Sequence, residues 1–593
     1  VAAQAFDVAI LEDATITNAV TFSNTGTLQI GNVGVGTAGA DISTFTGGLV
    51  ATAQATGADS IKLAGTINTT NTAMQLGDSD TGIRLLGNTT LATANGALNL
   101  DGAITGADSN DALTLNAGTG AAALITSAES ITDITTLTIT NSGGATFDKA
   151  VNTSVSVVLT NTDAGDDIIF GNVAGGDLTT ATLTVAAQAF DVAILEDATI
   201  TNAVTFSNTG LLVLGNGTDD TLTFGGGITA IAQAAGGYDA DAIKIAGDII
   251  TTNDVVNLGS ATAGITLTAD STITTGAGAG NIDLDGIIIG GGNSLGLNAG
   301  SGLITSALEI SGISTLTITQ SGGTIFTGNV GATTVTLTDS TGAIEFDGDL
   351  AATTLNVAAG AINGGFDVEI NENANITNAV TFSNTGLLVL GDGTDDILTF
   401  TGGLVATAPS AITLNGKIIT GGTNTMTLGD TGDDATGITL ADSTTLESGG
   451  AAAININGAL AGASVDDNLT ITSIGTTNIN AEISGIGTFI TDTDGKTVIA
   501  ANISSDGLQT YGNAVHLKTG AVTLTTTNDA VTFSGTLNSA AGEIQGLTVA
   551  AGAGLTTFDA EVGGSVGVGA IAITGSGGLE LNADIGNTDP SAG

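Results

Sequence analysis

Apolar and polar residues alternate over short stretches along the whole chain. Segments such as FDVAI, AVTF, LLVL and TLTF follow one another about every 8 to 12 residues, and Thr, Asn or Asp separates their apolar positions. Strict alternation is typical of a half-buried β-strand. The intervening NTG, GNG, TDD and GGG stretches favour turns. Because no stretch shows helical spacing, the sequence predicts an all-β chain of many short strands.

These segments belong to a much longer repeat. The stretch from Val1 to Gly26 recurs unchanged from Val185 to Gly210, and a looser version of it from Val357 to Gly386 keeps TNAVTFSNTG letter for letter. We predict repeat copies at 1–184, 185–356 and 357–546, followed by a partial fourth copy at 547–593. The chain begins at Val within a copy, so we expect it to be a processed product or a segment of a longer protein.

Two architectures fit many short strands in tandem. A string of β-sandwich domains needs linkers and usually a Trp or Tyr in each core, but the chain has no Trp, two Tyr and 90 Gly. A β-solenoid stacks coils about 4.8 Å apart, which suits ladders of Val, Ile and Thr with Gly at the corners. The chain has two prolines, and both lie outside the predicted strands. Pro409 lies where the third copy shortens QATGADSIK to PSAIT, and Pro590 lies in the last residues of the sequence. We therefore predict an elongated β-solenoid, with tandem β-sandwich domains as the alternative.

The charge of the chain restricts its partners. It carries 58 acidic and seven basic residues, a net charge of −51. Nucleic-acid binding depends on Lys and Arg replacing phosphate counterions, and anionic membranes would repel this chain. No apolar stretch is long enough for a transmembrane helix, and the absence of Cys excludes disulfides and thiolate metal sites. We predict no nucleic-acid partner and no membrane span, and we expect cations to be attracted.

Five adjacent aspartate pairs lie in turns that lead into predicted strands. An Asp in such a turn can accept a hydrogen bond from its own backbone, whereas loop carboxylates and carbonyls are also the ligands that calcium prefers. Acids stacked on successive coils at about 4.8 Å would repel by about 0.9 kcal/mol in water. We therefore expect one of three arrangements: acids staggered between coils, cations bound among the acids, or a protein that works in salty surroundings. The sequence leaves both alternatives open, with calcium as a candidate cofactor. The candidate calcium ligands are Asp166, Asp167, Asp219, Asp220, Asp395, Asp396, Asp433, Asp434, Asp466 and Asp467.

Catalytic patterns are weak. Neighbouring aspartates alternate sides of a strand, which disfavours a glycosidase couple, and the chain has one histidine, His516, and no GxSxG elbow. The GVGTAG stretch, with Gly34, Gly36 and Gly39, matches a dinucleotide-binding pattern but precedes no predicted helix. We predict that the chain is not an enzyme and has no catalytic or cofactor-binding residues.

The stretch from Asp506 to Ile585 resembles the β-strand-repeat arrays of giant bacterial surface proteins, which include filamentous-haemagglutinin-type adhesins and autotransporter passengers. The phrases QTYGNAV, AVTLTTTNDAVTFSGTLNSA, LTVAAG and TTFDAEVGG carry the resemblance. It implies a right-handed parallel β-helix, export from a Gram-negative cell, and attachment or matrix building. It transfers no catalytic residues to this chain.

Taken together, these features predict a structural rod at the cell surface or outside the cell, acting in adhesion or matrix building. Its expected partners are other copies of itself or surface and matrix polymers. One alternative is a self-assembling extracellular fibre or surface-layer subunit, since strand edges can join end to end. A second alternative is a polysaccharide-acting enzyme built on a β-helix.

Overall fold

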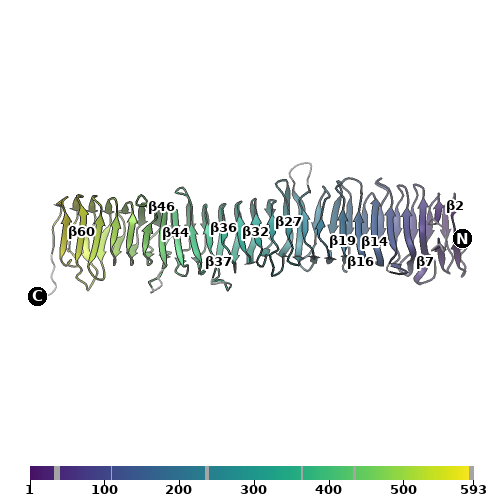
Figure 1. Ribbon diagram of the computed structural model, residues 1–593, viewed down its shortest axis with the longest axis horizontal. Helices are drawn as coiled ribbons and strands as arrows, with labels where there is room; N and C mark the ends of the chain where they lie inside the picture. The colour runs from purple at the N-terminus through teal and green to yellow at the C-terminus, as the bar shows by residue number, and fades with distance from the viewer. Residues whose placement is uncertain (33–40, 109, 234–238, 362–364, 432–435, 587–593) are drawn as a thin grey trace. The chain divides into compact units, whose positions relative to one another are not determined.

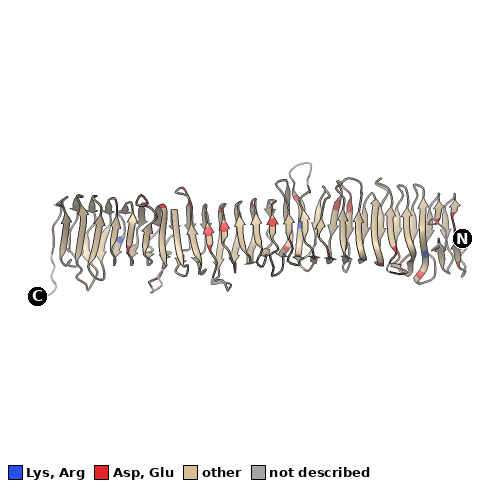
Figure 2. Ribbon diagram, viewed as in Figure 1, with Lys and Arg blue, Asp and Glu red and all other residues tan. Residues whose placement is uncertain are grey.

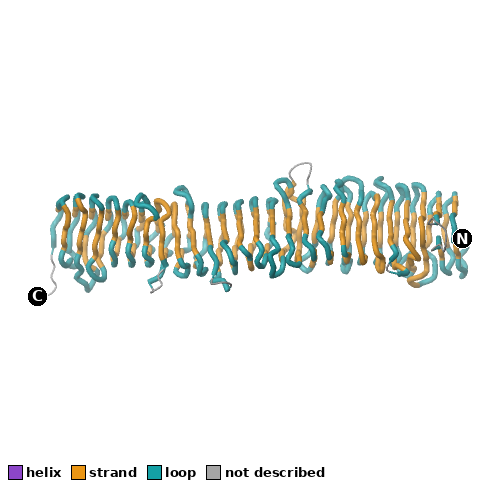
Figure 3. The backbone as a smooth tube through the Cα atoms, viewed as in Figure 1, coloured by secondary structure: helices purple, strands orange, loops and turns teal. Residues whose placement is uncertain are grey.

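The chain forms an all-β solenoid. A computed structural model describes residues 1–32, 41–108, 110–233, 239–361, 365–431 and 436–586. Within these residues every regular element is a strand, and the strands stack in parallel as a β-solenoid of about 23 turns (Figures 1 and 3). This arrangement confirms the predicted β-solenoid and rules out the alternative of tandem β-sandwich domains for the described residues. The chain divides into two compact units, Val1–Leu308 and Glu309–Gly593.

Each coil of the first unit contributes to three parallel faces. Six long strands cross a corner and belong to two faces: β7 (Gly57–Thr69), β9 (Thr81–Ala92), β14 (Ile131–Asn141), β16 (Val151–Leu159), β26 (Asp239–Thr251) and β28 (Ala263–Thr274). The first face also contains β1 (Val8–Ile10), β4 (Leu28–Ile30), β11 (Ile104–Gly106), β18 (Leu178–Thr180), β21 (Ala198–Ile200), β24 (Thr221–Phe224) and β31 (Leu295–Asn298). The second contains β2 (Ala14–Ile16), β5 (Ile42–Phe45), β12 (Ala112–Asn116), β19 (Thr182–Val185), β22 (Val204–Thr205), β25 (Ile228–Ala230), β27 (Val256–Leu258), β29 (Ile282–Leu284) and β32 (Leu303–Ser306). The third contains β3 (Val20–Phe22), β6 (Leu49–Ala51), β8 (Met74–Leu76), β10 (Leu98–Leu100), β13 (Ile125–Ser127), β15 (Ala145–Phe147), β17 (Asp167–Phe170), β20 (Asp191–Ile194), β23 (Leu212–Leu214) and β30 (Ile288–Ile289).

The second unit repeats this plan. Its corner-crossing strands are β33 (Ile310–Gln320), β35 (Val330–Leu337), β37 (Leu350–Val357), β44 (Ala411–Thr420) and β46 (Gly437–Ser448). One face adds β39 (Ala374–Ile376), β42 (Ile397–Phe400), β49 (Leu469–Ser473), β52 (Phe489–Thr491), β55 (Gln509–Tyr511), β58 (Val531–Phe533), β61 (Thr556–Phe558) and β63 (Leu579–Leu581). Another adds β40 (Val380–Thr381), β43 (Leu404–Ala406), β45 (Met426–Leu428), β47 (Ile454–Ile456), β50 (Thr476–Ile479), β53 (Lys496–Ile499), β56 (Ala514–Leu517) and β59 (Leu537–Ser539). The third adds β34 (Gly323–Phe326), β36 (Ile344–Phe346), β38 (Val368–Ile370), β41 (Leu387–Leu390), β48 (Leu460–Gly462), β51 (Ile483–Ile486), β54 (Ile503–Ser505), β57 (Val522–Thr526), β60 (Leu547–Gly552) and β62 (Ile571–Gly575).

Alternation along each strand places apolar side chains inside the coil. In β4, Leu28 and Ile30 are fully buried while Gln29 between them points outward. Pairing in register places like residues above one another, so that Phe147 and Phe170 stack at 5.1 Å between ring centres. The interior is therefore the narrow aliphatic core that the alternation predicts, with short aromatic stacks.

Glycine is required where a long strand turns a corner. Gly65 and Gly247 have φ values of 77° and 70°. A Cβ at Gly65 would lie 2.4 Å from the carbonyl oxygen of Asp41, and one at Gly247 would lie 2.3 Å from that of Asp220. Only a residue without a side chain fits these two corners. Pro409 lies between β43 and β44, outside the strands as predicted.

The identical sequences of the first and second copies lie on different faces. The face of β1 continues through β16 to β18 and then to β21, which has the sequence of β2. The strand with the sequence of β1 is β20, and it pairs with β17 on another face. The same residues therefore form strands on two different faces of the solenoid. The copy boundaries at 184, 356 and 546 stay predictions.

Candidate functional site

Two of the predicted aspartates cap their own turns. Asp220 is buried, and its Oδ2 accepts hydrogen bonds from the backbone N–H groups of Asn216 (2.6 Å) and Gly217 (2.8 Å). Asp396 repeats this arrangement one copy later, where its Oδ2 accepts hydrogen bonds from the backbone N–H groups of Asp392 (3.0 Å) and Gly393 (2.7 Å). A carboxylate that accepts two backbone N–H bonds holds the turn closed.

The other members of these pairs face solvent. Asp219 and Asp395 are exposed. The pair at the start of β49 behaves in the same way, because Asp467 is buried and accepts from the N–H of Ser464 (2.6 Å) while Asp466 is exposed. In three of the predicted pairs the two carboxyl groups are thus separated, one as a buried cap and one on the surface.

The remaining two pairs differ. Asp167 begins β17 and lies opposite Asp191 in β20, on the next coil. Burial raises the pKa of Asp191, the hydrogen bond from Leu211 N–H (2.7 Å) opposes that shift, and the neighbouring carboxylates of Asp167 and Asp166 add to it. The structure therefore brings acids of neighbouring coils together, and Asp191 is a member that the adjacent-pair pattern missed. Asp433 and Asp434 lie outside the described residues.

A second contact between acids occurs in the second unit. Glu345 in β36 lies directly opposite Glu369 in β38, and red segments of the ribbon mark Asp and Glu positions on the strands in Figure 2. Burial is the main cause that raises the pKa of each glutamate, and for Glu369 the charge of Glu345 raises it further. These carboxyl groups are half-buried beside like charge, so they hold protons more tightly than a free glutamate does.

Several other acids lie beside an amide or hydroxyl donor of a neighbouring coil, which is the staggered arrangement that the sequence left as one of three alternatives. An amide or hydroxyl group on a neighbouring coil commonly donates to the carboxylate. Examples are Asn172 to Asp148 (2.8 Å), Asn371 to Asp347 (2.8 Å), Asn373 to Asp349 (3.0 Å), Thr305 to Asp283 (2.9 Å) and Asn582 to Asp559 (2.8 Å). Such pairs replace stacked like charges with charge-assisted hydrogen bonds.

No group of three or more His, Asp or Glu side chains placed to hold a metal ion occurs in the part of the chain that the structure describes. The cap carboxylates already accept backbone hydrogen bonds, and their exposed neighbours point to solvent. Binding of calcium by the aspartate pairs stays a prediction.

The basic side chains contact residues of the same or a neighbouring coil. Arg84 forms an ion pair with Asp59 (3.8 Å) and lies opposite Lys62 on the adjacent strand, and Lys417 pairs with Glu447 (2.7 Å). His516 lies in β56 between Val498 and Asn538 of the neighbouring coils. Burial and the charge of Lys496 lower the pKa of His516. The GVGTAG stretch lies outside the described residues.

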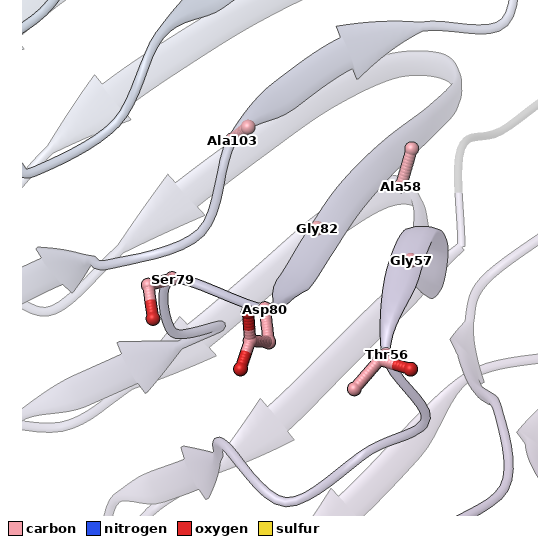
Figure 4. A pocket seen from close by; sticks show the side chains of 7 residues that line it. All are labelled: Thr56, Gly57, Ala58, Ser79, Asp80, Gly82 and Ala103. Carbon is pink, nitrogen blue, oxygen red and sulfur yellow. The ribbon is translucent and has the colours of Figure 1, made fainter.

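A shallow pocket of about 450 Å³ lies in the first unit beside the corner at Gly57 (Figure 4). The backbone N–H of Gly57 donates to the carbonyl oxygen of Asp80 at 2.8 Å. The lining residues are Thr56, Gly57, Ala58, Ser79, Asp80, Gly82 and Ala103. These residues supply one carboxylate and two hydroxyl groups, without the second carboxyl group of a typical glycosidase.

Comparisons with known proteins return no match: no family model, no curated protein and no solved structure is similar to this chain at a significant level. Among the described residues, no helix is long and apolar enough to cross a membrane.

Proposed function

We propose that this chain is a structural, non-catalytic protein of the cell surface or extracellular matrix of a Gram-negative bacterium, acting as a rod in adhesion or matrix building. The observation that carries the proposal is the stacked parallel coil, found in both units with a continuous aliphatic core. Each coil of such a fold is stabilised by its neighbours, so the structure lengthens simply by adding copies.

The outward faces support a contact role. In the first unit, Thr66, Thr90, Thr114 and Thr138 lie opposite one another on successive coils. Such a column offers hydroxyl groups at a spacing of about 4.8 Å on a flat surface. Hydroxyl columns can hydrogen-bond neutral surface and matrix polymers, whereas the net charge of −51 disfavours nucleic acid as a partner.

Labelling with antibodies tests the location and role together. Antibodies against the purified protein should label intact cells of the source bacterium as strongly as permeabilised cells, and cells that lack the protein should attach less to surfaces or to one another. Labelling that requires permeabilisation would contradict the proposal.

The enzyme alternative has its own test, because the pocket beside Gly57 carries a carboxylate. Purified protein incubated with acidic and neutral glycans should release neither new reducing ends nor unsaturated products. Turnover that disappears in an Asp80→Asn variant would replace the non-catalytic proposal with a glycan-acting enzyme.

A further inference from the structure

Basic side chains are rare in this chain, yet three of them lie together in the second unit. The chain has seven Lys and Arg residues and one His, and blue positions are few in Figure 2. Lys496 begins β53, and His516 and Lys518 lie in and directly after β56, the next strand on the same face. Their neighbours Thr497 and Leu517 are buried, so alternation turns the three basic side chains outward.

These side chains form a regular pattern with Val498, and the four residues are here called the basic surface. His516 lies directly opposite Val498 on the neighbouring coil. Lys496 lies two residues before Val498 on the first coil, and Lys518 lies two residues after His516 on the second. The two lysines therefore lie on a diagonal, with the imidazole between them.

The charge of the basic surface lacks a close partner within the chain. Burial is the main cause that lowers the pKa of His516, and the charge of Lys496 lowers it further. The imidazole is therefore mostly uncharged near neutral pH, where it still donates a hydrogen bond. Lys518 lies near Glu543, but the carboxylate of Glu543 already accepts a hydrogen bond from the backbone N–H of Thr519 (2.9 Å). Neither lysine forms an ion pair among the residues that the structure describes.

A cluster of opposite charge lies on another face of the same unit. Glu345 in β36 lies directly opposite Glu369 in β38. Asp347 lies two residues after Glu345 on the first coil, and Asp367 lies two residues before Glu369 on the second. Burial, and then the charge of each of the other three carboxylates, raises the pKa of Glu369, so the four carboxyl groups lie close together. These four residues are here called the acidic surface.

The two surfaces match position by position when a second copy faces the first with the coils running in the same direction. A half-turn about the coil-stacking direction reverses the strand direction and keeps the order of the coils. Both surfaces share the same spacings, about 4.8 Å between coils and about 6.6 Å between alternate residues of a strand. The facing pairs are then Asp347 with Lys496, Asp367 with Lys518, and Glu369 with His516.

We propose that the basic surface binds the acidic surface of a second copy of this chain, with the two copies side by side. This inference rests on the structural role proposed above and deepens it by naming the partner and the two surfaces. Complementary charge fixes the register of the copies and relieves the repulsion among the four carboxylates. A carboxylated polymer would match the charge of the basic surface but not its diagonal. The contact joins unlike surfaces, so association continues beyond dimers.

Charge reversal at one facing pair tests the docking. Lys496 and Asp347 are both exposed, so either can be reversed with an unchanged far-ultraviolet circular dichroism spectrum. The unaltered chain should associate in sedimentation velocity as its concentration rises. Lys496→Asp and Asp347→Lys should each weaken that association by about fivefold or more, and the double variant should restore it. Lys149→Asp makes the same change of charge in the first unit, so it is the control and should associate as the unaltered chain does. An unaltered chain that stays monomeric, single variants that associate equally, or a double variant as weak as either single one would overturn the docking.

Cross-linking tests the facing pairs directly. A carbodiimide joins a lysine amine to a carboxylate that it contacts, and mass spectrometry of heavy-isotope-labelled copies mixed with unlabelled copies identifies links between copies. Lys496 of one copy should be linked to Asp347 of the other. Links between copies that join other residues and never this pair would contradict the docking. Binding of a carboxylated glycan to the basic surface of a chain that stays monomeric would also overturn it. Surface labelling of cells is independent of these results, so failure here leaves the structural role standing.

Discussion

The side-chain amide of Gln233 donates to the amide oxygen of Asn208 at 3.3 Å, on the preceding coil. Asn208 is fully buried and donates in turn to the carbonyl oxygen of Phe190 at 3.1 Å. Gln54 and Asn24 form the same contact in the first copy, at 3.4 Å. In the third copy the shortened gap carries Pro409 instead of the glutamine, and Asn384 Oδ1 is without a partner among the described residues. The repeated SNTG sequence thus encodes a buried polar link that two copies complete.

Replacing Gln233 with Ala should destabilise the protein by about 1 to 3 kcal/mol, because it leaves buried carbonyl and amide groups of the neighbouring coil unpaired. The midpoint of urea unfolding measures the change. Gln188 is exposed, so Gln188→Ala is the matched control and should shift stability by less than about 0.5 kcal/mol. Equal midpoints for the two variants would show that the buried link contributes nothing.

The two members of an aspartate pair should differ sharply. Asp220→Ala removes the acceptor for two backbone N–H groups and should cost about 1 kcal/mol or more. Asp219→Ala alters an exposed side chain and should be nearly neutral. Chemical denaturation of both variants measures the difference. Equal losses would mean that the pair acts as one unit, against the assignment of Asp220 as a cap.

Calcium provides an independent test of the same corners. If the buried acids serve as caps, calcium and magnesium at equal ionic strength should shift the thermal midpoint equally, since both only screen repulsion among acids. Melting in calcium, magnesium and chelator makes the comparison. A rise specific to calcium that disappears in Asp219→Asn and Asp395→Asn would instead establish those positions as ligands.

The contact between Glu345 and Glu369 should make the free energy of unfolding rise as the pH falls. Burial first, and then the charge of Glu345, raises the pKa of Glu369 above its ordinary value of 4.5. The folded state therefore binds the proton more tightly than the unfolded state, so stability is gained as the pH drops from neutrality through the raised pKa. Glu369→Gln should stabilise the protein at pH 7 by about 0.5 kcal/mol and weaken this pH dependence. Urea unfolding midpoints across the acidic range measure both effects. Glu482 is exposed, so Glu482→Gln is the control. A midpoint that falls as the pH falls, together with a Glu369→Gln variant of unchanged stability, would contradict the account.

Local pattern was sufficient to predict the strands and the core. Alternation places Leu28 and Ile30 inside and Gln29 outside, and it needs no knowledge of distant residues. Local pattern did not predict that β1 and β20, which share one sequence, lie on different faces. The face that a copy occupies depends on how many strand segments separate it from the previous copy. Long strands such as β7 conceal that number, since one uninterrupted strand turns a corner at Gly65 and contributes to two faces.

The candidate site was predictable only within single turns. The sequence of GNGTDD is enough to propose a cap by Asp220, because donor and acceptor lie four residues apart. The contact of Asp167 with Asp191 depends on the register between two coils, and no local signal specifies that register. Matching of acids to Asn and Thr donors on the next coil escaped prediction for the same reason.

The in-register stacking of coils is tested most directly by distances between spin labels, which a Cys-free chain allows without background labelling. Thr66 and Thr184 belong to one outward column, linked through Thr90, Thr114, Thr138 and Val158. Five coil spacings of about 4.8 Å separate their backbones, so labels at Thr66→Cys and Thr184→Cys should lie about 24 Å apart in a single narrow distribution. A broad distribution, or one centred far from this distance, would contradict the stacked solenoid.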